Sequence, residues 1–284
     1  MAAAGQQILF GAYAGERDGR DTESSLYELE RLVGRPLGLH RIFRGWSDPS
    51  FDTEASRSAQ FGRVPLVSWK PITKTGKIPW ADIAAGKQDA KIAEVAGFLQ
   101  MTGTHAIVCF HHEPELATGY GTPAEYAAAY DHWRGQFDRS GVTGVRHAVI
   151  CSPRAYRDHG AIAAQFWPSA PVDWVGVNAY NWFGCTSGQE TAWVPLGNSC
   201  RSAATWAAYR ELPLVVAEWG SVEDPARPGR KAAWIAQALE WAKMTSVVQA
   251  MSYQHSLGSC PWWLDSSDSA LAAFRAAVED PGTN

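Results

Sequence analysis

The chain alternates short apolar runs with longer segments in which apolar residues recur every three or four positions. The apolar runs are rich in β-branched and aromatic residues, and each ends in polar or aromatic side chains, a pattern typical of buried parallel strands. The intervening segments have helical spacing, as in Ile92, Val95 and Leu99. The pattern therefore predicts strands at residues 8–13, 37–43, 64–68, 106–110, 147–151, 172–178, 214–218 and 247–253.

Several of the expected helices carry recognisable start and stop signals. One helix is expected to begin near residue 21 or 22 and to close at Gly34. Another begins at Thr122, where Pro123 suits the first turn and Glu125 completes a capping box. A long polar loop is expected over 183–201, followed by helices near 203–210, 228–244 and from 267 or 268 onward.

Eight strand-then-helix units follow one another without a linker or a break in composition. Such alternation predicts an α/β fold with a parallel sheet, and eight units close the sheet into a single (β/α)8 TIM barrel. Residues 1–284 are accordingly expected to form one catalytic barrel domain. A doubly wound open sheet is the alternative, but its Gly-rich phosphate turn is missing from the segment GAYAGERDG after the first strand.

Composition and charge narrow the range of partners. A net charge of −4 without a basic run argues against nucleic acid. No apolar run of about 18 residues occurs, so no membrane span is expected. The first ten residues lack the pattern of a signal peptide. We nevertheless expect an extracellular, monomeric protein.

The cysteines bear on the compartment. Cys185 and Cys200 flank the polar loop and are expected to be able to form a disulfide, which would indicate an oxidising compartment. Cys109 and Cys151 lie in strand-like runs and are expected to be buried thiols.

Two glutamates mark the ends of strands in the expected barrel. Glu113 follows the fourth strand, and Glu218 ends the seventh. The carboxyl ends of all barrel strands open on one face, so the two carboxylates are expected to face each other there. A spacing of about 5–5.5 Å would suit hydrolysis with retention of configuration. The alternative for either glutamate is a salt bridge at the rim, and Glu115 is expected to be structural.

The histidines beside Glu113 raise the question of a metal. Neighbouring side chains of a strand point to opposite faces, so His111, His112 and Glu113 would form a poor chelate. The motif HExxH is also absent, because Leu116 stands where its second histidine would be. We therefore expect no metal and no organic cofactor, and we expect His112 to orient a carboxyl group or a sugar hydroxyl.

Fourteen tryptophans supply many flat apolar faces, on which sugars can stack. Core packing is the alternative role for each aromatic residue. The stacking candidates at strand ends are Trp69, Trp182, Trp219 and Tyr253. The candidates for binding sugar hydroxyls are Lys70, Arg44, Arg154 and His255.

These motifs together resemble glycoside hydrolase family 26, the clan-A barrels best known as endo-β-1,4-mannanases. The pair His112–Glu113 is similar to the acid/base motif of the family, and LVVAEWGS is similar to its nucleophile strand, with Glu218 as nucleophile. The segment VDWVGVNAYNW resembles the family stretch whose tyrosine lies near the nucleophile, which implies that role for Tyr180. The ending WLDSSDSALAAFR resembles the tails of bacterial members.

The sequence departs from the family pattern beside the sugar sites. Cys109 stands where many family mannanases have arginine, and PELATGYG after the acid/base motif differs from their usual continuation. The resemblance implies a retaining endo-β-glycanase whose partner is a polysaccharide or oligosaccharide substrate, with β-1,4-mannan as the expected polymer. Mixed-linkage β-glucan, β-1,3-xylan or a cell-wall glycan are alternative substrates. A non-catalytic carbohydrate-binding barrel and a metal-dependent hydrolase are the alternative functions.

Overall fold

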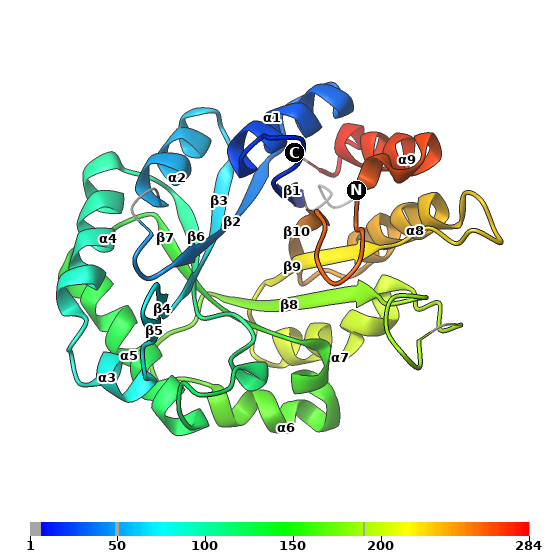
Figure 1. The fold of residues 1–284 in the computed structure, drawn as a ribbon. Helices are drawn as coiled ribbons and strands as arrows, with labels where there is room; N and C mark the ends of the chain where they lie inside the picture. Colours follow the sequence, from blue (N-terminus) through cyan, green and yellow to red (C-terminus); the bar gives the residue numbers. More distant parts are fainter. Residues whose placement is uncertain (1–6, 49–50, 190, 284) are drawn as a thin grey trace, which may run out of the picture. The chain divides into compact units, whose positions relative to one another are not determined.

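The computed structural model describes residues 7–48, 51–189 and 191–283, and side chains are described there except at 51 and 52. Eight strands form a closed barrel in the order β1-β10-β9-β8-β7-β6-β3-β2 (Figure 1). The pairs β1–β10, β10–β9, β3–β6 and β6–β7 are all parallel. The predicted α/β fold, a single (β/α)8 barrel, is therefore confirmed.

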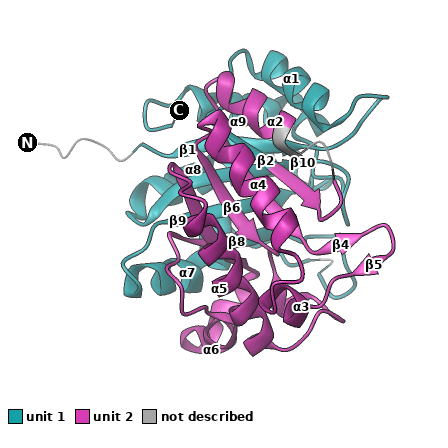
Figure 2. Ribbon diagram, turned by 90° about the vertical axis from the view of Figure 1, so that its left-hand side faces the viewer, with its two compact units in different colours: residues 1–41, 177–284 teal, residues 42–176 magenta. Residues whose placement is uncertain are grey.

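The chain divides into two compact units, residues 1–41 with 177–284 and residues 42–176 (Figure 2). Strands β2 and β8 contribute residues to both. That residues 1–284 form one domain stays a prediction.

The first unit contains the elements that carry Glu218. Its strands are β1 (Leu9–Ala14), β9 (Leu214–Ser221) and β10 (Val248–His255), with parts of β2 (Leu39–Gly45) and β8 (Trp174–Asn181). Its helices are α1 (Thr22–Val33), α7 (Leu196–Tyr209), α8 (Arg230–Met244), the short η3 (Leu264–Ser266) and α9 (Asp268–Glu279).

The second unit contains the elements that carry Glu113. Its barrel strands are β3 (Val64–Lys70), β6 (Ala106–Phe110) and β7 (Val145–Cys151), and a small hairpin joins β4 (Ile72–Thr73) to β5 (Gly76–Lys77). The helices are α2 (Phe51–Gln60), α3 (Trp80–Ala84), α4 (Asp89–Thr102), η1 (Pro114–Leu116), α5 (Pro123–Arg139), η2 (Pro153–Tyr156) and α6 (Arg157–Phe166). The hairpin and α3 were not predicted.

The strong local signals produced the expected boundaries. Both halves of the capping box of α5 form, because the Thr122 side chain accepts from the Glu125 backbone and the Glu125 side chain accepts from the Thr122 backbone. Gly34 ends α1 in the left-handed conformation. Across the described ranges, no helix is both long enough and apolar enough to cross a bilayer.

Several boundaries differ from the prediction, and those of α7 and β8 have a clear structural reason. Helix α7 begins at Leu196, several residues before the predicted start, because Leu196 and Cys200 are buried against the rest of the unit. Tertiary packing here overrides the weak helix propensity of the segment LGNSC. Strand β8 extends to Asn181, whose side chain donates to Ser221 Oγ at 2.9 Å.

Candidate active site

Glu218 lies near the end of β9, and three side chains donate hydrogen bonds to its carboxylate. Arg41 Nη2 and Asn178 Nδ2 donate to Oε1 at 3.1 and 2.9 Å. The Tyr180 hydroxyl donates to Oε2 at 2.8 Å. Glu218 is 8% exposed, and Arg41 is 0% exposed. The carboxylate is thus fixed in orientation by one cationic and two neutral donors, while a small part of it stays open.

The alternation of side chains along β9 explains why neighbouring residues have different surroundings. Successive residues of a strand point to opposite faces. Glu218 points toward Arg41, Asn178 and Tyr180. Trp219 points the other way and packs on Trp234 of α8, with ring centroids 5.7 Å apart.

An aromatic wall holds Tyr180. The ring of Trp262, in the loop after β10, lies 4.8 Å from that of Tyr180, and Trp182 packs edge-on against Trp262 at 5.3 Å. Trp262 is only 2% exposed and belongs to a small apolar cluster with Val222 and Cys260. This packing limits the positions that the Tyr180 hydroxyl can take beside Glu218.

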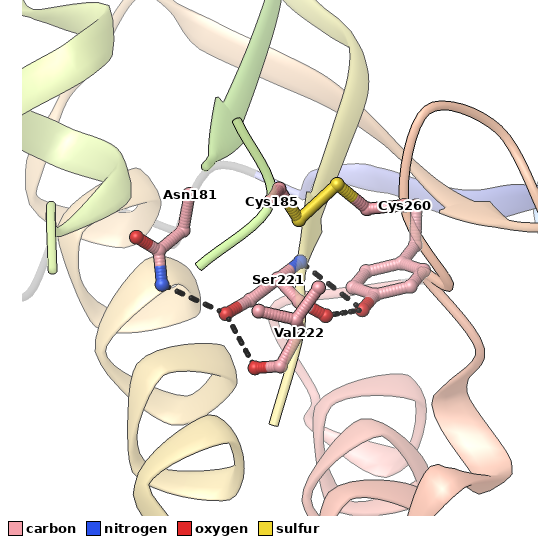
Figure 3. The surroundings of a disulfide bond; sticks show 6 residues. Asn181, Cys185, Ser221, Val222 and Cys260 are labelled. Carbon is pink, nitrogen blue, oxygen red and sulfur yellow. Dashed lines mark hydrogen bonds between the residues drawn. A yellow bond between two sulfur atoms is a disulfide. The ribbon is translucent and has the colours of Figure 1, made fainter. Parts of the chain in front are cut away.

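A disulfide joins the two loops that carry this wall. Cys185, in the loop after β8, is bonded to Cys260, in the loop after β10, across a sequence separation of 75 (Figure 3). The expected pairing of Cys185 with Cys200 is therefore wrong. Cys200 is a buried free thiol on the inward face of α7. The burial predicted for Cys109 and Cys151 is confirmed.

In the second unit, Glu113 follows β6 in an unusual backbone conformation. His111 and Glu113 both have positive φ, at 47° and 52°. The strand end is nevertheless anchored on both sides, since His111 N donates to Trp69 O at 2.8 Å and Glu113 N donates to Ile150 O at 2.7 Å. Non-glycine residues in this region cost roughly 1–3 kcal/mol each and are concentrated at functional sites.

The side chains beside Glu113 have separate roles. His111 is buried, and its Nδ1 accepts a hydrogen bond from Trp80 Nε1 at 3.0 Å. Burial lowers the pKa of His111 to about 3, so its ring is neutral. Glu115 accepts from the Ser152 backbone at 2.6 Å, and burial raises the pKa of its carboxyl group. His112 is half-buried, with its ring 5.4 Å from that of Phe43.

Three of the residues predicted to stack on sugars are buried in the structure. Trp69 is 1% exposed, and Trp219 and Tyr253 are 0% exposed. Trp69 packs among the rings of Trp46 and Trp133, and Tyr253 packs against Trp219 at 4.9 Å. These faces are covered by protein, so the packing alternative applies to all three. Trp182 is half-buried and keeps its candidate role.

Arg44 is also unsuited to its predicted role. It is 9% exposed and forms an ion pair with the buried carboxylate of Glu54. Its Nη1 donates to the Phe43 carbonyl at 2.8 Å. The guanidinium is thus engaged by the protein rather than open to a sugar hydroxyl. Lys70 and Arg154 are both exposed, at the end of β3 and just after β7, and remain candidates.

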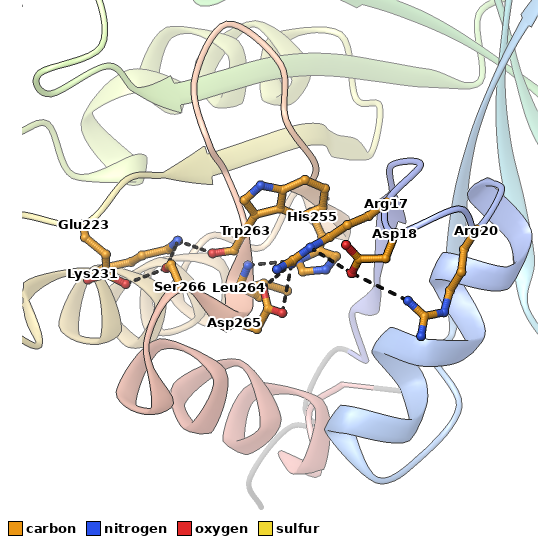
Figure 4. Close-up of polar contacts among 10 residues, drawn as sticks. All are labelled: Arg17, Asp18, Arg20, Glu223, Lys231, His255, Trp263, Leu264, Asp265 and Ser266. Atoms are coloured by element: carbon orange, nitrogen blue, oxygen red, sulfur yellow. Dashed lines mark hydrogen bonds and ion pairs between the residues drawn. The ribbon is translucent and has the colours of Figure 1, made fainter.

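His255 ends β10 inside a polar network (Figure 4). Its Nδ1 accepts from Leu264 N at 2.9 Å, and its ring lies edge-on to Trp263 at 5.0 Å. Burial lowers its pKa to about 4. Arg17 covers the other side of Trp263 and pairs with Asp265 at 2.9 Å. Arg17, Trp263, Asp265 and His255 line a crevice of about 150 Å³. That His255 binds a sugar hydroxyl stays a prediction.

Lys231 holds the same loop from the side of α8. It is 0% exposed and donates to Trp263 O at 2.6 Å and to Ser266 Oγ at 2.9 Å (Figure 4). Ser266 Oγ in turn donates to Glu223 at 2.7 Å. The loop that carries Trp262 is therefore anchored both by the disulfide and by a buried ammonium group.

Sequence reasoning missed three residues of the Glu218 surroundings, namely Arg41, Asn178 and Trp262. Arg41 gave a usable signal, since a charged residue inside an apolar strand must find a partner. Asn178 likewise lay at the predicted end of a buried strand. Trp262 had no such signal, because its place against Tyr180 depends on the path of a long loop.

Within the described ranges, no group of three or more His, Cys, Asp or Glu residues is arranged to hold a metal ion.

Comparison with known proteins finds similarity both in sequence and in structure. No family model matches the chain. Endoglucanase H of Acetivibrio thermocellus is 26% identical over 289 residues, which cover 98% of this chain and 31% of that protein. The chain therefore spans about a third of the length of the curated relative that it matches.

The similar structures include two described as mannanases of glycoside hydrolase family 26. A modular endo-β-1,4-mannanase from Cellulomonas fimi has a TM-score of 0.69 and 18% identity, covering 98% of this chain and 72% of that one. The catalytic domain of an endo-β-1,4-mannanase from Bacillus sp. JAMB-750 has a TM-score of 0.72 and 17% identity, covering 98% and 87%. The resemblance to family 26 that the motifs indicated is thus confirmed as a likeness of fold.

Proposed function

We propose that this chain is a secreted, retaining endo-β-glycanase of glycoside hydrolase family 26 and that its substrate is β-1,4-mannan. The observation that carries the proposal is the Glu218 carboxylate, held by three donors near the end of a barrel strand. The disulfide between Cys185 and Cys260 supports an oxidising compartment. The likeness of fold to family 26 mannanases supports the substrate.

In the proposed reaction, Glu218 and Glu113 divide the chemistry. Glu218 attacks the anomeric carbon and forms a covalent glycosyl-enzyme, while Glu113 donates a proton to the departing glycosidic oxygen. Glu113 then takes a proton from water, and the water oxygen displaces Glu218 from the anomeric carbon. Two inversions give net retention, and no metal or organic cofactor is required. The two carboxyl groups must lie about 5–5.5 Å apart for this reaction.

The remaining candidates act around these two carboxylates. The hydrogen bond from Tyr180 to Glu218 would fix the carboxylate oxygen that does not attack. His112 would orient Glu113 or a sugar hydroxyl. Trp182 would stack on a sugar ring, and Lys70, Arg154 and His255 would bind hydroxyls.

The catalytic pair is tested by substitution and chemical rescue. Glu218→Ala and Glu113→Ala should each lower kcat on polymer at least about a thousandfold, while Glu240→Ala, at an exposed position on α8, should match the wild type. Azide should restore turnover of an activated aryl glycoside by both variants. It should give the α-glycosyl azide with Glu218→Ala and the β-glycosyl azide with Glu113→Ala. Undiminished cleavage by Glu218→Ala would refute the proposal.

β-Glucan is a second candidate substrate, favoured by the sequence match to a protein named as an endoglucanase. Purified protein should be incubated with β-mannan, mixed-linkage β-glucan, β-1,3-xylan and a cell-wall glycan, and the released sugars identified. Oligosaccharides from mannan are expected. Release from β-glucan alone would replace the mannan assignment, and release from none would favour a non-catalytic binding role.

A further inference from the structure

A groove of about 570 Å³ lies between helices α7 and α8 and is lined by residues of both, together with residues 245–247. Its lining includes α7 residues from Leu196 to Ala208, a stretch of roughly 18 Å at 1.5 Å per residue. Neither Glu218 nor any residue of its aromatic wall lines the groove. Its length along α7 suits an extended ligand of several sugar rings.

Trp241 of α8 provides a fixed aromatic surface in this groove. A Cβ added at Gly197 would lie 2.5 Å from Trp241 Cδ1, 2.7 Å from Cγ and 2.9 Å from Nε1, so the helix backbone packs directly on one face of the indole. Trp241 is half-buried, and its Nε1 donates to no group in the described part of the chain. The indole is therefore held in place and still has an N–H to offer to a ligand.

Two neutral amides lie near the indole. Asn198 and Gln237 line the groove, and both are exposed. Asn198 Oδ1 accepts from Arg201 at 3.1 Å. Among the residues that the structure describes, the Asn198 NH₂ group and the Gln237 carboxamide have no hydrogen-bond partner. The groove thus presents donors and acceptors without protein partners on both of its helices.

The charge of the lining defines the ligand class. Arg201 is the one charged residue among the described residues that line the groove, and the lining contains no carboxylate. Nucleic acid would require several cations, and an amphipathic peptide helix would require a continuous apolar row. Uncharged amides and an indole with its N–H, beside apolar side chains, match a neutral, hydroxyl-rich chain.

We propose that the α7–α8 groove is a second glycan-binding site, which holds a neutral polysaccharide chain apart from the strand end that carries Glu218. The choice of polymers for its test and the expected effect on activity rest on the proposed function, whereas binding in the groove does not. Binding there would keep the enzyme on the polymer between cleavages. It would raise activity on long or insoluble glycans and leave activity on short soluble ones unchanged.

Affinity electrophoresis of the Glu218→Ala protein in gels containing galactomannan, mixed-linkage β-glucan or xylan tests binding without cleavage. Adding Trp241→Ala should raise the dissociation constant for the retained polymer about tenfold, the effect of losing one good contact. Tyr209→Ala is the matched control, because Tyr209 is an aromatic residue of α7 that is 80% exposed and does not line the groove. It should leave the dissociation constant unchanged.

Two gentler variants keep the test valid if Trp241→Ala fails to fold. Gly197→Ala keeps the indole but forces it to shift, and Gln237→Ala removes one exposed amide. Both should weaken retention by the polymer while hydrolysis of a short aryl oligosaccharide stays at the wild-type rate. Thermal unfolding of each variant checks that it is folded.

The outcomes separate this inference from the proposed function. Retention equal to that of the Tyr209→Ala control in all three groove variants would overturn the second site, even if the enzyme cleaves mannan. Retention by none of the gels would overturn it as well. If the protein cleaves no polymer but its groove variants lose retention, the second site is supported and the catalytic proposal is refuted.

Discussion

The three donors to Glu218 differ in charge and in the oxygen that they contact. Arg41 and Asn178 share Oε1, whereas Tyr180 alone contacts Oε2. A single substitution can therefore remove the restraint on one carboxylate oxygen and leave the other oxygen in place.

Tyr180→Phe removes only the hydroxyl and keeps the ring that packs on Trp262. Loss of this preorganised donor is expected to lower kcat about ten- to a hundredfold, with a much smaller change in KM. Steady-state kinetics on the best polymer measures this, with Tyr209→Phe, on an exposed tyrosine, as the control. An unchanged kcat would show that the hydrogen bond does not assist the reaction.

Arg41 is predicted to be coupled in stability to Glu218. Arg41→Met leaves a buried carboxylate without its cation and should destabilise the protein by about 3–5 kcal/mol. In a Glu218→Gln background the same change should cost at least about 1 kcal/mol less, because no charge is left unpaired. Urea denaturation of the four proteins gives the coupling free energy. A value near zero would contradict the role of the ion pair.

At the scale of single residues, the sequence correctly predicted which side chains lie at strand ends, but it did not predict which of them are exposed. Glu218 and Tyr180 were predicted and lie in hydrogen-bonding contact. Trp219 directly follows Glu218, and the alternation of a strand turns it into the core, which the sequence could have indicated. The burial of Trp69 depends on Trp46 and Trp133, which are distant in sequence, so local pattern could not reveal it.

At the scale of elements, the loops after β8 and β10 form one connected structure. The disulfide ties the segment around Cys185 to Cys260, and Lys231 anchors the same loop at Trp263 O. Trp262 lies between these two attachments and supports Tyr180. The position of a donor to Glu218 thus depends on loops rather than on strands alone.

Removal of the disulfide is expected to loosen this support. Cys185→Ser with Cys260→Ser should lower the free energy of unfolding by about 2–4 kcal/mol, and should also lower kcat because Tyr180 loses its restraint. Thermal unfolding and kinetics measure the two effects. Cys200→Ser, at a buried free thiol, is the control for losing a sulfur without losing a crosslink.

Element boundaries could be predicted where local chemistry decides them. The capping box at Thr122 and the glycine at Gly34 gave correct helix ends. The early start of α7 could not be predicted, because it depends on the burial of Leu196 and Cys200 against parts of the unit that are distant in sequence. The predicted pairing of Cys185 with Cys200 was wrong for a related reason. Cys200 is nearer to Cys185 in sequence than Cys260 is, but it lies on the buried face of α7.

At the scale of the whole molecule, three buried neutral histidines govern the response to acid. Burial lowers the pKa of His111 and His147 to about 3 and that of His255 to about 4. The unfolded chain takes up protons near pH 6.5, whereas the folded imidazoles stay neutral. The free energy of unfolding should therefore fall as the pH drops below about 6.5, by up to about 2 kcal/mol per histidine at pH 5.

His147→Gln tests this prediction. Its ring is 2% exposed and packs edge-on against Phe137, away from the candidate catalytic residues. The variant should lose less stability between pH 7 and pH 5 than the wild type does, measured by urea denaturation at both values. His105→Gln, at an exposed histidine, is the control. An identical pH dependence in His147→Gln and the wild type would contradict the prediction.

The barrel itself could be predicted because its signal is repeated eight times along the chain. An error in one boundary, such as the end of β8, leaves the order of the strands unchanged. Closure also depends on single close contacts, such as that of Gly11, where a Cβ would lie 1.8 Å from the Leu39 carbonyl oxygen. Contacts of this kind cannot be recognised from the sequence alone.

The burial of the three free thiols has a consequence for how the protein matures. Cys109, Cys151 and Cys200 are enclosed once the strands and helices have packed, so their thiols are not available to exchange with the disulfide in the loops. Disulfides between the wrong cysteines then cannot form in the folded chain, because the buried thiols are inaccessible. Air or a simple oxidant should suffice to complete the native crosslink after refolding, without an isomerase to reshuffle it.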